Sequence, residues 1–216
     1  MEDRSARKRP ASFLLIGPTG SGKTPFGDHL ERKGIGGARC VHFDFGDQLR
    51  TVAGREILPS GFEPHEHSFV RKVLAEGLLL EDEHFPIAGK ILASFARSRG
   101  VGQEDIIVLN GLPRHRGQAM DMDGIVDVRC LIVLDCTPEE VYERIRQNTG
   151  GDRAERDDDG IGLVRKKLAI YSSRTEPLIE YYSKAGRRVL RMKVGVSSTA
   201  QDLYREFLSL FDYGSE

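Results

Sequence analysis

An unbroken glycine-rich octet, GPTGSGKT at residues 17–24, places the strongest constraint on the fold of this chain. The residues before it, ASFLLIG, form the short apolar run typical of a buried strand. Residues 26–33 after it have the pattern of a helix that stops at Gly34. The octet matches G-x-x-x-x-G-K-[ST], in which glycines let consecutive backbone N–H groups point into one concavity at a helix N-terminus. Strand, loop and helix together predict a phosphate-binding site.

The chemistry of this loop assigns a task to each of its last two residues. Lys23 is expected to reach the β- and γ-phosphates of a nucleoside triphosphate, and the Thr24 hydroxyl is expected to ligate Mg²⁺. The candidate phosphate-binding residues are therefore Gly17, Pro18, Thr19, Gly20, Ser21, Gly22, Lys23 and Thr24.

The rest of the chain repeats the alternation of strand and helix. Further strands are expected at residues 39–43, 106–110, 129–135 and 188–194, with helical patterns between them. Near-continuous apolar strands separated by helices indicate a parallel sheet covered on both faces. We therefore expect an α/β fold, a three-layer α/β/α arrangement with a five-stranded parallel sheet. A charged tail at 1–10 precedes a single domain at 11–216.

Two segments do not serve the sheet. Residues 44–97 hold more apolar periodicity than one crossover helix needs, so a small helical insertion is expected there. Its His65-Glu66-His67 sequence has no third ligand at metal-binding spacing, and we interpret it as a solvated loop without a metal. Residues 147–160 are rich in Gly, Asp and Arg and predict an exposed loop that can act as a lid.

Composition excludes some classes of partner. The 32 Lys and Arg residues nearly balance the 33 Asp and Glu residues, so overall charge favours neither nucleic acid nor a membrane surface as a partner. The apolar runs are strand-sized, and the first ten residues lack the apolar stretch of a signal peptide. We expect a soluble, cytoplasmic monomer.

Four ordered segments resemble the adenylate kinase family of nucleoside monophosphate kinases, in its short-lid form. After the phosphate-binding loop (P-loop), HFDFGDQLR at 42–50 resembles the family's H-x-S-T-G-D-M-L-R, and VLNGLPRHRGQ at 108–118 resembles L-x-D-G-F-P-R-x-x-x-Q. The fourth segment runs from ERIRQNTGGDRAERDDD to VRKKLAIYSSRTEPLIEYYSKAG and resembles the family's lid and the helices after it. The resemblance covers nearly the whole chain after residue 10.

This resemblance implies a role for particular residues. It implies transfer of the ATP γ-phosphoryl group to a nucleoside monophosphate, AMP above others, at a site that uses Mg²⁺. Arg144 would lie near the ATP adenine, and Arg156 of the lid would close on the transferring group. The residues implied to bind the monophosphate are Phe45, Arg50, Leu80, Gly111, Arg114, Gln118, Arg156 and Lys167, and those implied in catalysis are Lys23, Arg114, Arg144, Arg156 and Lys167.

The chain departs from the family pattern at four of these motif positions. Asn110 stands where the family has an aspartate that holds a water of the Mg²⁺ shell, and Phe45 stands where it has a threonine. Asn148 and Lys167 replace arginines, and Lys167 offers a point charge instead of a planar fork. These changes leave two alternatives open: a kinase for another acceptor such as a pyrimidine monophosphate, or a catalytically weak nucleotide-binding regulatory protein.

Overall fold

The computed structural model describes residues 9–55, 61–78, 80–152 and 160–211. Its strands are β1 (Ala11–Ile16), β2 (Cys40–Asp44), β3 (Ile106–Asn110), β4 (Asp127–Asp135) and β5 (Arg188–Lys193). Its helices are α1 (Lys23–Lys33), α2 (Phe45–Ala53), α3 (Pro64–Glu76), α4 (Phe85–Ser98), α5 (Arg116–Met122), α6 (Pro138–Gln147), α7 (Ile161–Ile170), α8 (Pro177–Lys184) and α9 (Ala200–Leu210). A 3-10 turn, η1 (Asp82–His84), and a π-helical turn, η2 (Tyr171–Thr175), complete the described elements. The expected tail at 1–10 and lid at 147–160 lie partly outside the described residues.

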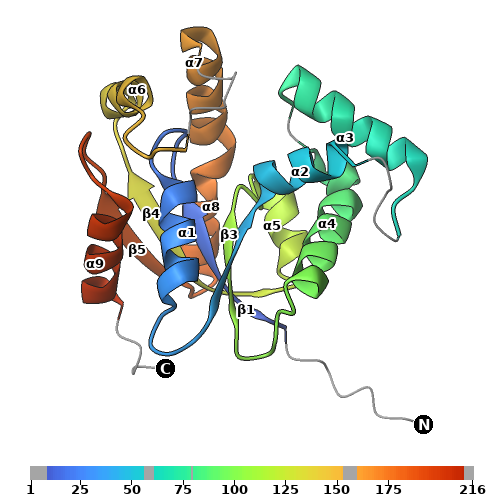
Figure 1. The fold of residues 1–216 in the computed structure, drawn as a ribbon, viewed down its shortest axis with the longest axis horizontal. Coiled ribbons are helices and arrows are strands. Elements are labelled where there is room, and N and C mark those ends of the chain that lie inside the picture. The colour runs from blue at the N-terminus through green and yellow to red at the C-terminus, as the bar shows by residue number, and fades with distance from the viewer. Residues whose placement is uncertain (1–8, 56–60, 79, 153–159, 212–216) are drawn as a thin grey trace.

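The five strands form one parallel sheet in the order β2-β3-β1-β4-β5, which confirms the predicted α/β class (Figure 1). Because all strands run the same way, their carboxyl ends meet at one edge of the sheet. The chain after β1 passes into α1 at that edge, and β3 and β4 flank β1 on its two sides. This is the position at which open α/β sheets bind ligands.

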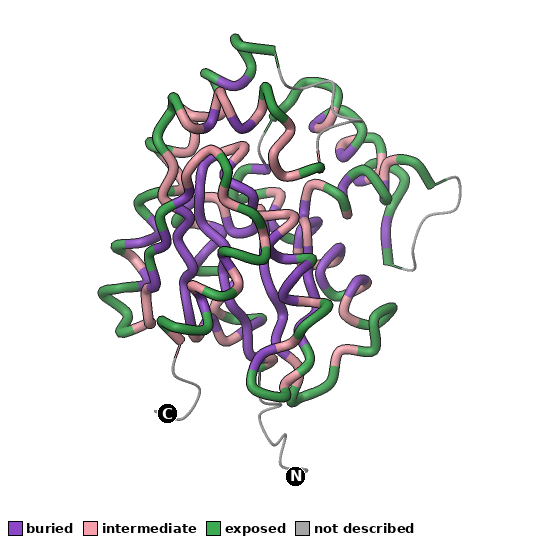
Figure 2. Tube along the Cα trace, turned by 60° about the vertical axis from the view of Figure 1, so that its left-hand side comes forward, coloured by how far each residue is buried: buried purple, intermediate pink, exposed green. Residues whose placement is uncertain are grey.

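Alternate strand residues build two separate cores, one on each face of the sheet. On one face Phe13 and Leu15 of β1 pack with residues of α1 and α9. On the other face Leu14 and Ile16 pack with residues of α4, α5 and α8. The strands are buried throughout most of their length, and most exposed residues lie in the surrounding helices and loops (Figure 2). The predicted three-layer arrangement is confirmed.

One local prediction needs correction. The His65-Glu66-His67 segment is not a solvated loop, because it lies in the first turn of α3 with Glu66 buried. Between α7 and α8 the helix is divided by the π-helical turn η2, in which Glu176 N–H donates to Tyr171 O, five residues earlier. Pro177 has no N–H to continue the four-residue pattern, and the wider turn accommodates the gap.

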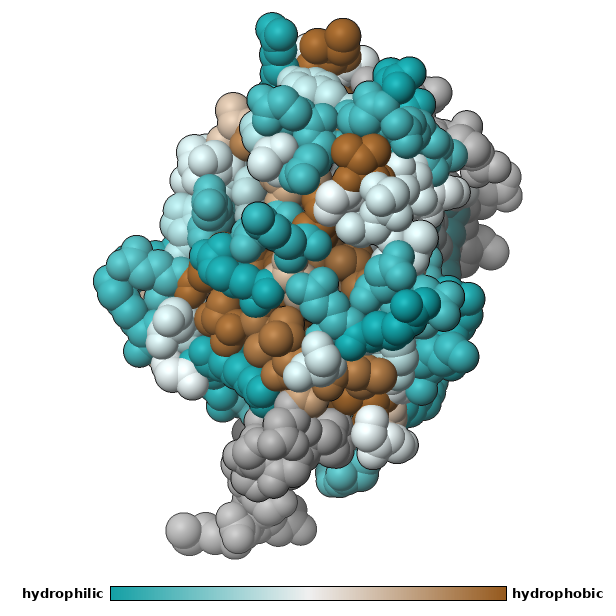
Figure 3. All heavy atoms as spheres, turned by 90° about the vertical axis from the view of Figure 1, so that its left-hand side faces the viewer, coloured by the Kyte–Doolittle hydropathy of each residue, from teal (hydrophilic) through white to brown (hydrophobic). Residues whose placement is uncertain are grey.

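The outer surface mixes polar and apolar groups. The side that carries α9 shows hydrophobic atoms among hydrophilic ones (Figure 3), and Leu208 and Leu210 of that helix are 44% and 40% exposed. Across the described parts of the chain, none of the helices has the length and apolar character needed to span a bilayer.

Candidate functional site

The glycine-rich octet forms a tight loop between β1 and α1. Gly20 and Gly22 have positive φ angles of 79° and 93°, which glycine adopts without steric cost. A Cβ at Gly17 would lie 2.9 Å from the Leu134 carbonyl oxygen, so the loop also needs glycine where it passes β4. The Lys23 ammonium donates to the carbonyl oxygens of Gly17 and Pro18, each at 2.7 Å. The lysine is thus held across the mouth of its own loop.

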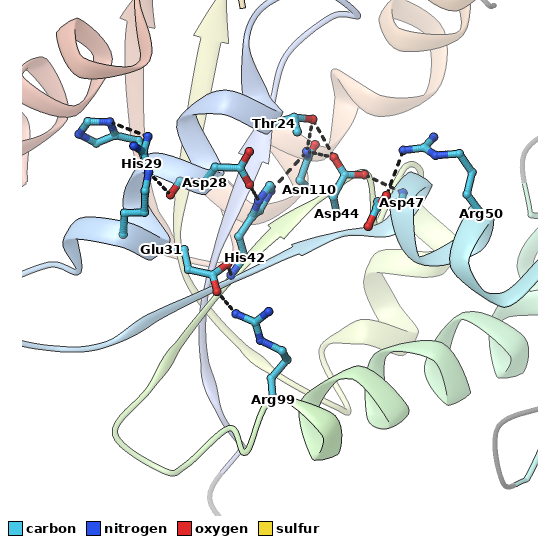
Figure 4. A network of polar contacts seen from close by, with 11 residues as sticks. Thr24, Asp28, His29, Glu31, His42, Asp44, Asp47, Arg50, Arg99 and Asn110 are labelled. Carbon is cyan, nitrogen blue, oxygen red and sulfur yellow. Dashed lines mark hydrogen bonds and ion pairs between the residues drawn. The ribbon is translucent and has the colours of Figure 1, made fainter. Parts of the chain in front are cut away.

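A polar network stands beside this loop at the ends of β2 and β3 (Figure 4). Asp44 and Asn110 are directly paired in the sheet register. Asp44 Oδ2 accepts hydrogen bonds from the Thr24 hydroxyl at 2.7 Å and from Asn110 Nδ2 at 2.9 Å. Asn110 Nδ2 also lies 3.2 Å from Thr24 Oγ1. A carboxylate, a hydroxyl and an amide therefore converge next to the phosphate-binding loop.

A single cavity of about 300 Å³ brings these elements together with the helices at 44–97. Val73, Leu74 and Leu78 form an apolar part of its wall. Another part of the wall is formed by Ile170, Tyr171 and Thr175. The sequence-predicted residues that line it are Gly17, Thr19, Gly20, Gly22, Lys23, Thr24, Arg50, Asn110, Gly111, Arg114 and Lys167. Residues from both the donor and the acceptor motifs therefore meet in one cavity.

Arg114 is held from behind by residues of its own motif. Its Nε donates to Gly111 O at 2.9 Å, and its backbone N–H donates to Gln118 Oε1 at 2.8 Å. Burial lowers the pKa of the Arg114 guanidinium from its usual value, and the negative charge of Asp44 opposes that shift. The Gln118 amide nitrogen donates to Leu80 O at 2.8 Å. Gln118, which is 1% exposed, thus ties the arginine to the chain around Leu80.

Arg144 is built into the structure behind the loop. Its side chain is 2% exposed, and its Nε donates to Gly20 O at 3.0 Å. Its Nη1 donates to three carbonyl oxygens of the β5–α9 connection, those of Gly195, Val196 and Ser198. Burial lowers the pKa of this guanidinium as well. Arg144 therefore joins the phosphate-binding loop to the segment after β5, and its implied contact with adenine stays a prediction.

The remaining predicted site residues lie in different surroundings. Arg50 is 55% exposed in its side chain and forms an ion pair with Asp47 at 3.6 Å. Phe45 is 2% exposed and packs against Phe43 in the core, with ring centroids 6.0 Å apart. Arg156 of the expected lid lies outside the described residues. The roles assigned to these three side chains stay predictions.

Asp44, whose carboxylate contacts Thr24 directly, was not among the site residues predicted from the sequence. A signal for it was present, because an acidic residue directly follows a buried apolar strand at the edge where parallel strands end. Thr175 was also missed: its hydroxyl donates to Arg114 O at 2.9 Å from the π-helical turn, whose geometry no sequence pattern indicated.

Comparison with known proteins gives consistent findings. Residues 14–161 match a family described as an AAA domain. The chain is 32% identical to adenylate kinase of Xanthomonas campestris pv. campestris (strain 8004), over 89% of this chain and 95% of that protein. It is 30% identical to adenylate kinase of Xylella fastidiosa (strain M23), over 81% and 86%. It is 26% identical to UMP-CMP kinase 1 of Oryza sativa subsp. japonica, over 94% of this chain and 75% of the relative.

Proposed function

The chain belongs to the adenylate kinase family of P-loop nucleoside monophosphate kinases, and we propose that it transfers the γ-phosphoryl group of ATP to AMP. One observation carries this proposal. Lys23 and Thr24 of the phosphate-binding loop line the same cavity as Arg50 and Arg114 of the acceptor motifs. Binding one triphosphate does not require the cationic side chains of Arg50 and Arg114 in addition to Lys23, but the three together suit two phosphate chains that meet end to end.

The reaction needs positioning and positive charge. An oxygen of the acceptor phosphate forms a bond to the γ-phosphorus, while the bond from that phosphorus to the β–γ bridging oxygen breaks. ADP leaves with the electron pair of the broken bond. Negative charge spreads over the transferring oxygens, and Lys23, Arg114 and Lys167, which line the cavity, would lower the barrier by stabilising that charge. In this proposal Arg50 and Arg114 hold the acceptor phosphate, and Arg144 and Arg156 act from the donor side and the lid.

The donor set next to Lys23 fits Mg²⁺, a hard cation that prefers oxygen ligands and keeps several waters. The Thr24 hydroxyl would bind the ion and Asn110 would hold a water of its shell. When bound, Mg²⁺ neutralises charge on the β- and γ-phosphates. The helices at 44–97 and the lid at 147–160 would close over both nucleotides and exclude water, which favours transfer over hydrolysis. We further propose that the protein acts as a cytoplasmic monomer.

The proposal is tested by incubating the purified protein with Mg·ATP and each of AMP, CMP, UMP and GMP in turn. Transfer to an acceptor produces ADP in excess of the control without acceptor, together with the diphosphate of that acceptor, which for AMP is a second ADP. We expect the highest kcat/KM with AMP. A higher kcat/KM for CMP or UMP would overturn AMP as the acceptor and retain the kinase. Absence of diphosphate product with all four would overturn the kinase reaction itself.

A further inference from the structure

The carboxylate expected at the end of β3 is found one strand away. Position 110 holds an amide, but its direct register partner on β2 is Asp44. In the motif comparison, position 44 is where the family has a serine and position 110 is where it has an aspartate. The two positions thus appear in this chain with their chemistry exchanged: the acid lies on β2 and the neutral polar group on β3.

The two carboxylate oxygens of Asp44 make different contacts. Oδ1 accepts from Asp47 N–H at 3.1 Å and caps the N-terminus of α2. Oδ2 accepts the Thr24 hydroxyl proton at 2.7 Å. With its proton directed to Asp44 and Asn110 Nδ2 donating to it at 3.2 Å, Thr24 Oγ1 retains a lone pair for a cation. The carboxylate therefore orients the hydroxyl as well as adding a negative charge beside it.

The side chains around Asp44 suit a cation that arrives with the nucleotide. Among the described residues, no group of three or more His, Cys, Asp or Glu side chains is placed to hold a metal ion without help. Mg²⁺ does not need such a cluster, because in phosphate-transfer sites it is held by one or two carboxylates together with substrate phosphates and water. Asp44, which is partly buried and lines the cavity with Thr24, can supply that carboxylate.

We propose that Asp44 is the carboxylate that holds the hydrated Mg²⁺ of bound ATP in this protein, and that it replaces an acid at position 110. Thr24 binds the ion beside it, and Asn110 fixes the Asp44 carboxylate through its amide hydrogens. This inference rests on the proposed function only in taking Mg·ATP as the donor. It does not depend on which monophosphate accepts the phosphoryl group.

The test measures metal affinity in the absence of acceptor. Mn²⁺ replaces Mg²⁺ as a paramagnetic probe, and electron paramagnetic resonance reports its binding to the protein saturated with a non-hydrolysable ATP analogue. Asp44→Asn removes the charge but retains the helix cap, because asparagine caps helices as well as aspartate. We expect this variant to bind Mn²⁺ at least about tenfold more weakly, as for other groups that support metal ligands. Its affinity for the metal-free nucleotide should not fall.

Two further variants separate charge position from general electrostatics. Asp44→Asn with Asn110→Asp returns the carboxylate to β3 at the same net charge as the natural chain, and it should regain most of the Mn²⁺ affinity. Asp47→Asn removes one negative charge from the first turn of α2, where Asp47 pairs with Arg50 rather than Thr24. This variant should retain the Mn²⁺ affinity of the natural protein. An unchanged Mn²⁺ affinity in Asp44→Asn, or an equal loss in Asp47→Asn, would overturn the proposal. Normal metal binding without transfer to any monophosphate would count only against the proposed function.

Discussion

Lys23 and Arg144 carry the same charge, but they meet different surroundings. Lys23 is partly buried, lines the cavity and donates to two carbonyl oxygens of its own loop. Arg144 is 2% exposed and donates to four carbonyl oxygens from two segments of the chain. A phosphate can take over the ammonium of Lys23 at little cost to the fold, whereas the guanidinium of Arg144 is part of the fold.

Replacing Lys23 with alanine should therefore remove activity and spare stability. We expect Lys23→Ala to lower kcat by at least about 100-fold, the loss found when one preorganised donor to a transition-state oxyanion is removed. Steady-state ADP formation measures this loss, and urea unfolding followed by circular dichroism measures stability. Lys33→Ala, at the exposed end of the same helix, is the matched control and should retain activity. Undiminished kcat in Lys23→Ala would remove this lysine from the reaction.

Replacing Arg144 with alanine should lower the stability of the fold. The variant leaves partly buried carbonyl oxygens of Gly20 and the β5–α9 connection without their donor, which we expect to cost about 2 to 4 kcal/mol in the free energy of unfolding. Urea unfolding monitored by circular dichroism measures the change. Arg146→Ala provides the control, since Arg146 is exposed on the same helix and pairs with Glu143, and a surface pair contributes less than about 1 kcal/mol. Equal stability of the two variants would contradict the structural role of Arg144.

Motifs predict the role of a residue where its partners lie close to it in the sequence. The octet 17–24 gave Lys23 and Thr24 because the spacing itself dictates their task. Gln118 and Phe45 show the limit: the Gln118 amide is bonded to Leu80 O, 38 residues away, and Phe45 is buried against Phe43. The first contact joins distant segments and the second depends on how the start of α2 packs against β2, and a motif encodes neither.

The secondary structure was more predictable than these contacts. Strand positions follow from apolar runs with turn residues at their ends, and all five were found within two residues of the expected bounds. The π-helical turn and the start of α3 were not predicted, because each depends on packing and on backbone bonds across a proline. Periodicity therefore locates elements, and it does not locate irregularities within them.

Close packing of α1 on β2 supplies a test of one such contact. A methyl group at Gly27 would overlap the His42 ring, which is 3% exposed and fixed by Asp28 Oδ1 at 2.8 Å from its Nδ1. Helix propensity favours alanine over glycine by about 1 kcal/mol, but overpacking a buried contact costs about 1 to 3 kcal/mol. We expect Gly27→Ala to lower the free energy of unfolding by up to about 2 kcal/mol, measured by urea unfolding.

The control for this variant is Gly162→Ala in α7. Gly162 is exposed, and a Cβ there meets no atom within 4 Å among those the structure describes. Propensity acts alone at this position, so the variant should be as stable as the natural protein or slightly more stable. A stabilised Gly27→Ala protein would show that the His42 ring moves aside without cost.

Charged contacts as well as apolar packing join the helices at 44–97 to the rest of the molecule. Arg174 of the π-helical turn η2 forms a two-point ion pair with Glu81, with distances of 2.7 and 2.6 Å. Hydrogen bonding from Arg174 lowers the pKa of Glu81 against the opposing effect of burial. Within the helices at 44–97, Glu66 of α3 meets Lys90 of α4 at 2.6 Å. Both pairs need ionised carboxylates, so the stability of the molecule should depend on pH.

The Glu66–Lys90 pair allows the sign of that dependence to be tested. Burial of Glu66, whose side chain is 9% exposed, opposes its charge, but hydrogen bonds from Lys90 and the Glu63 N–H outweigh burial and lower its pKa below the ordinary 4.5. A carboxyl with a lowered folded-state pKa contributes stability above about pH 4.5, and this contribution is lost as the pH falls through the folded-state value. In Lys90→Met burial persists without the cation, so the pKa of Glu66 should rise above its unfolded value. The variant should then gain stability on acidification, as the folded state takes up the proton first.

We therefore expect Lys90→Met to be about 1 to 2 kcal/mol less stable than the natural protein at pH 7, a value reduced from that of a fully buried pair because Lys90 is 38% exposed. The difference should shrink as the pH falls from 7 towards 4, as measured by urea unfolding at each pH with circular dichroism. Adding Glu66→Gln to Lys90→Met removes the carboxyl group that titrates. The part of the pH dependence that comes from the raised pKa of Glu66 should then disappear. A difference between Lys90→Met and the natural protein that stays constant across this range would show that Lys90 stabilises the helices by packing of its aliphatic chain and not through the charge of Glu66.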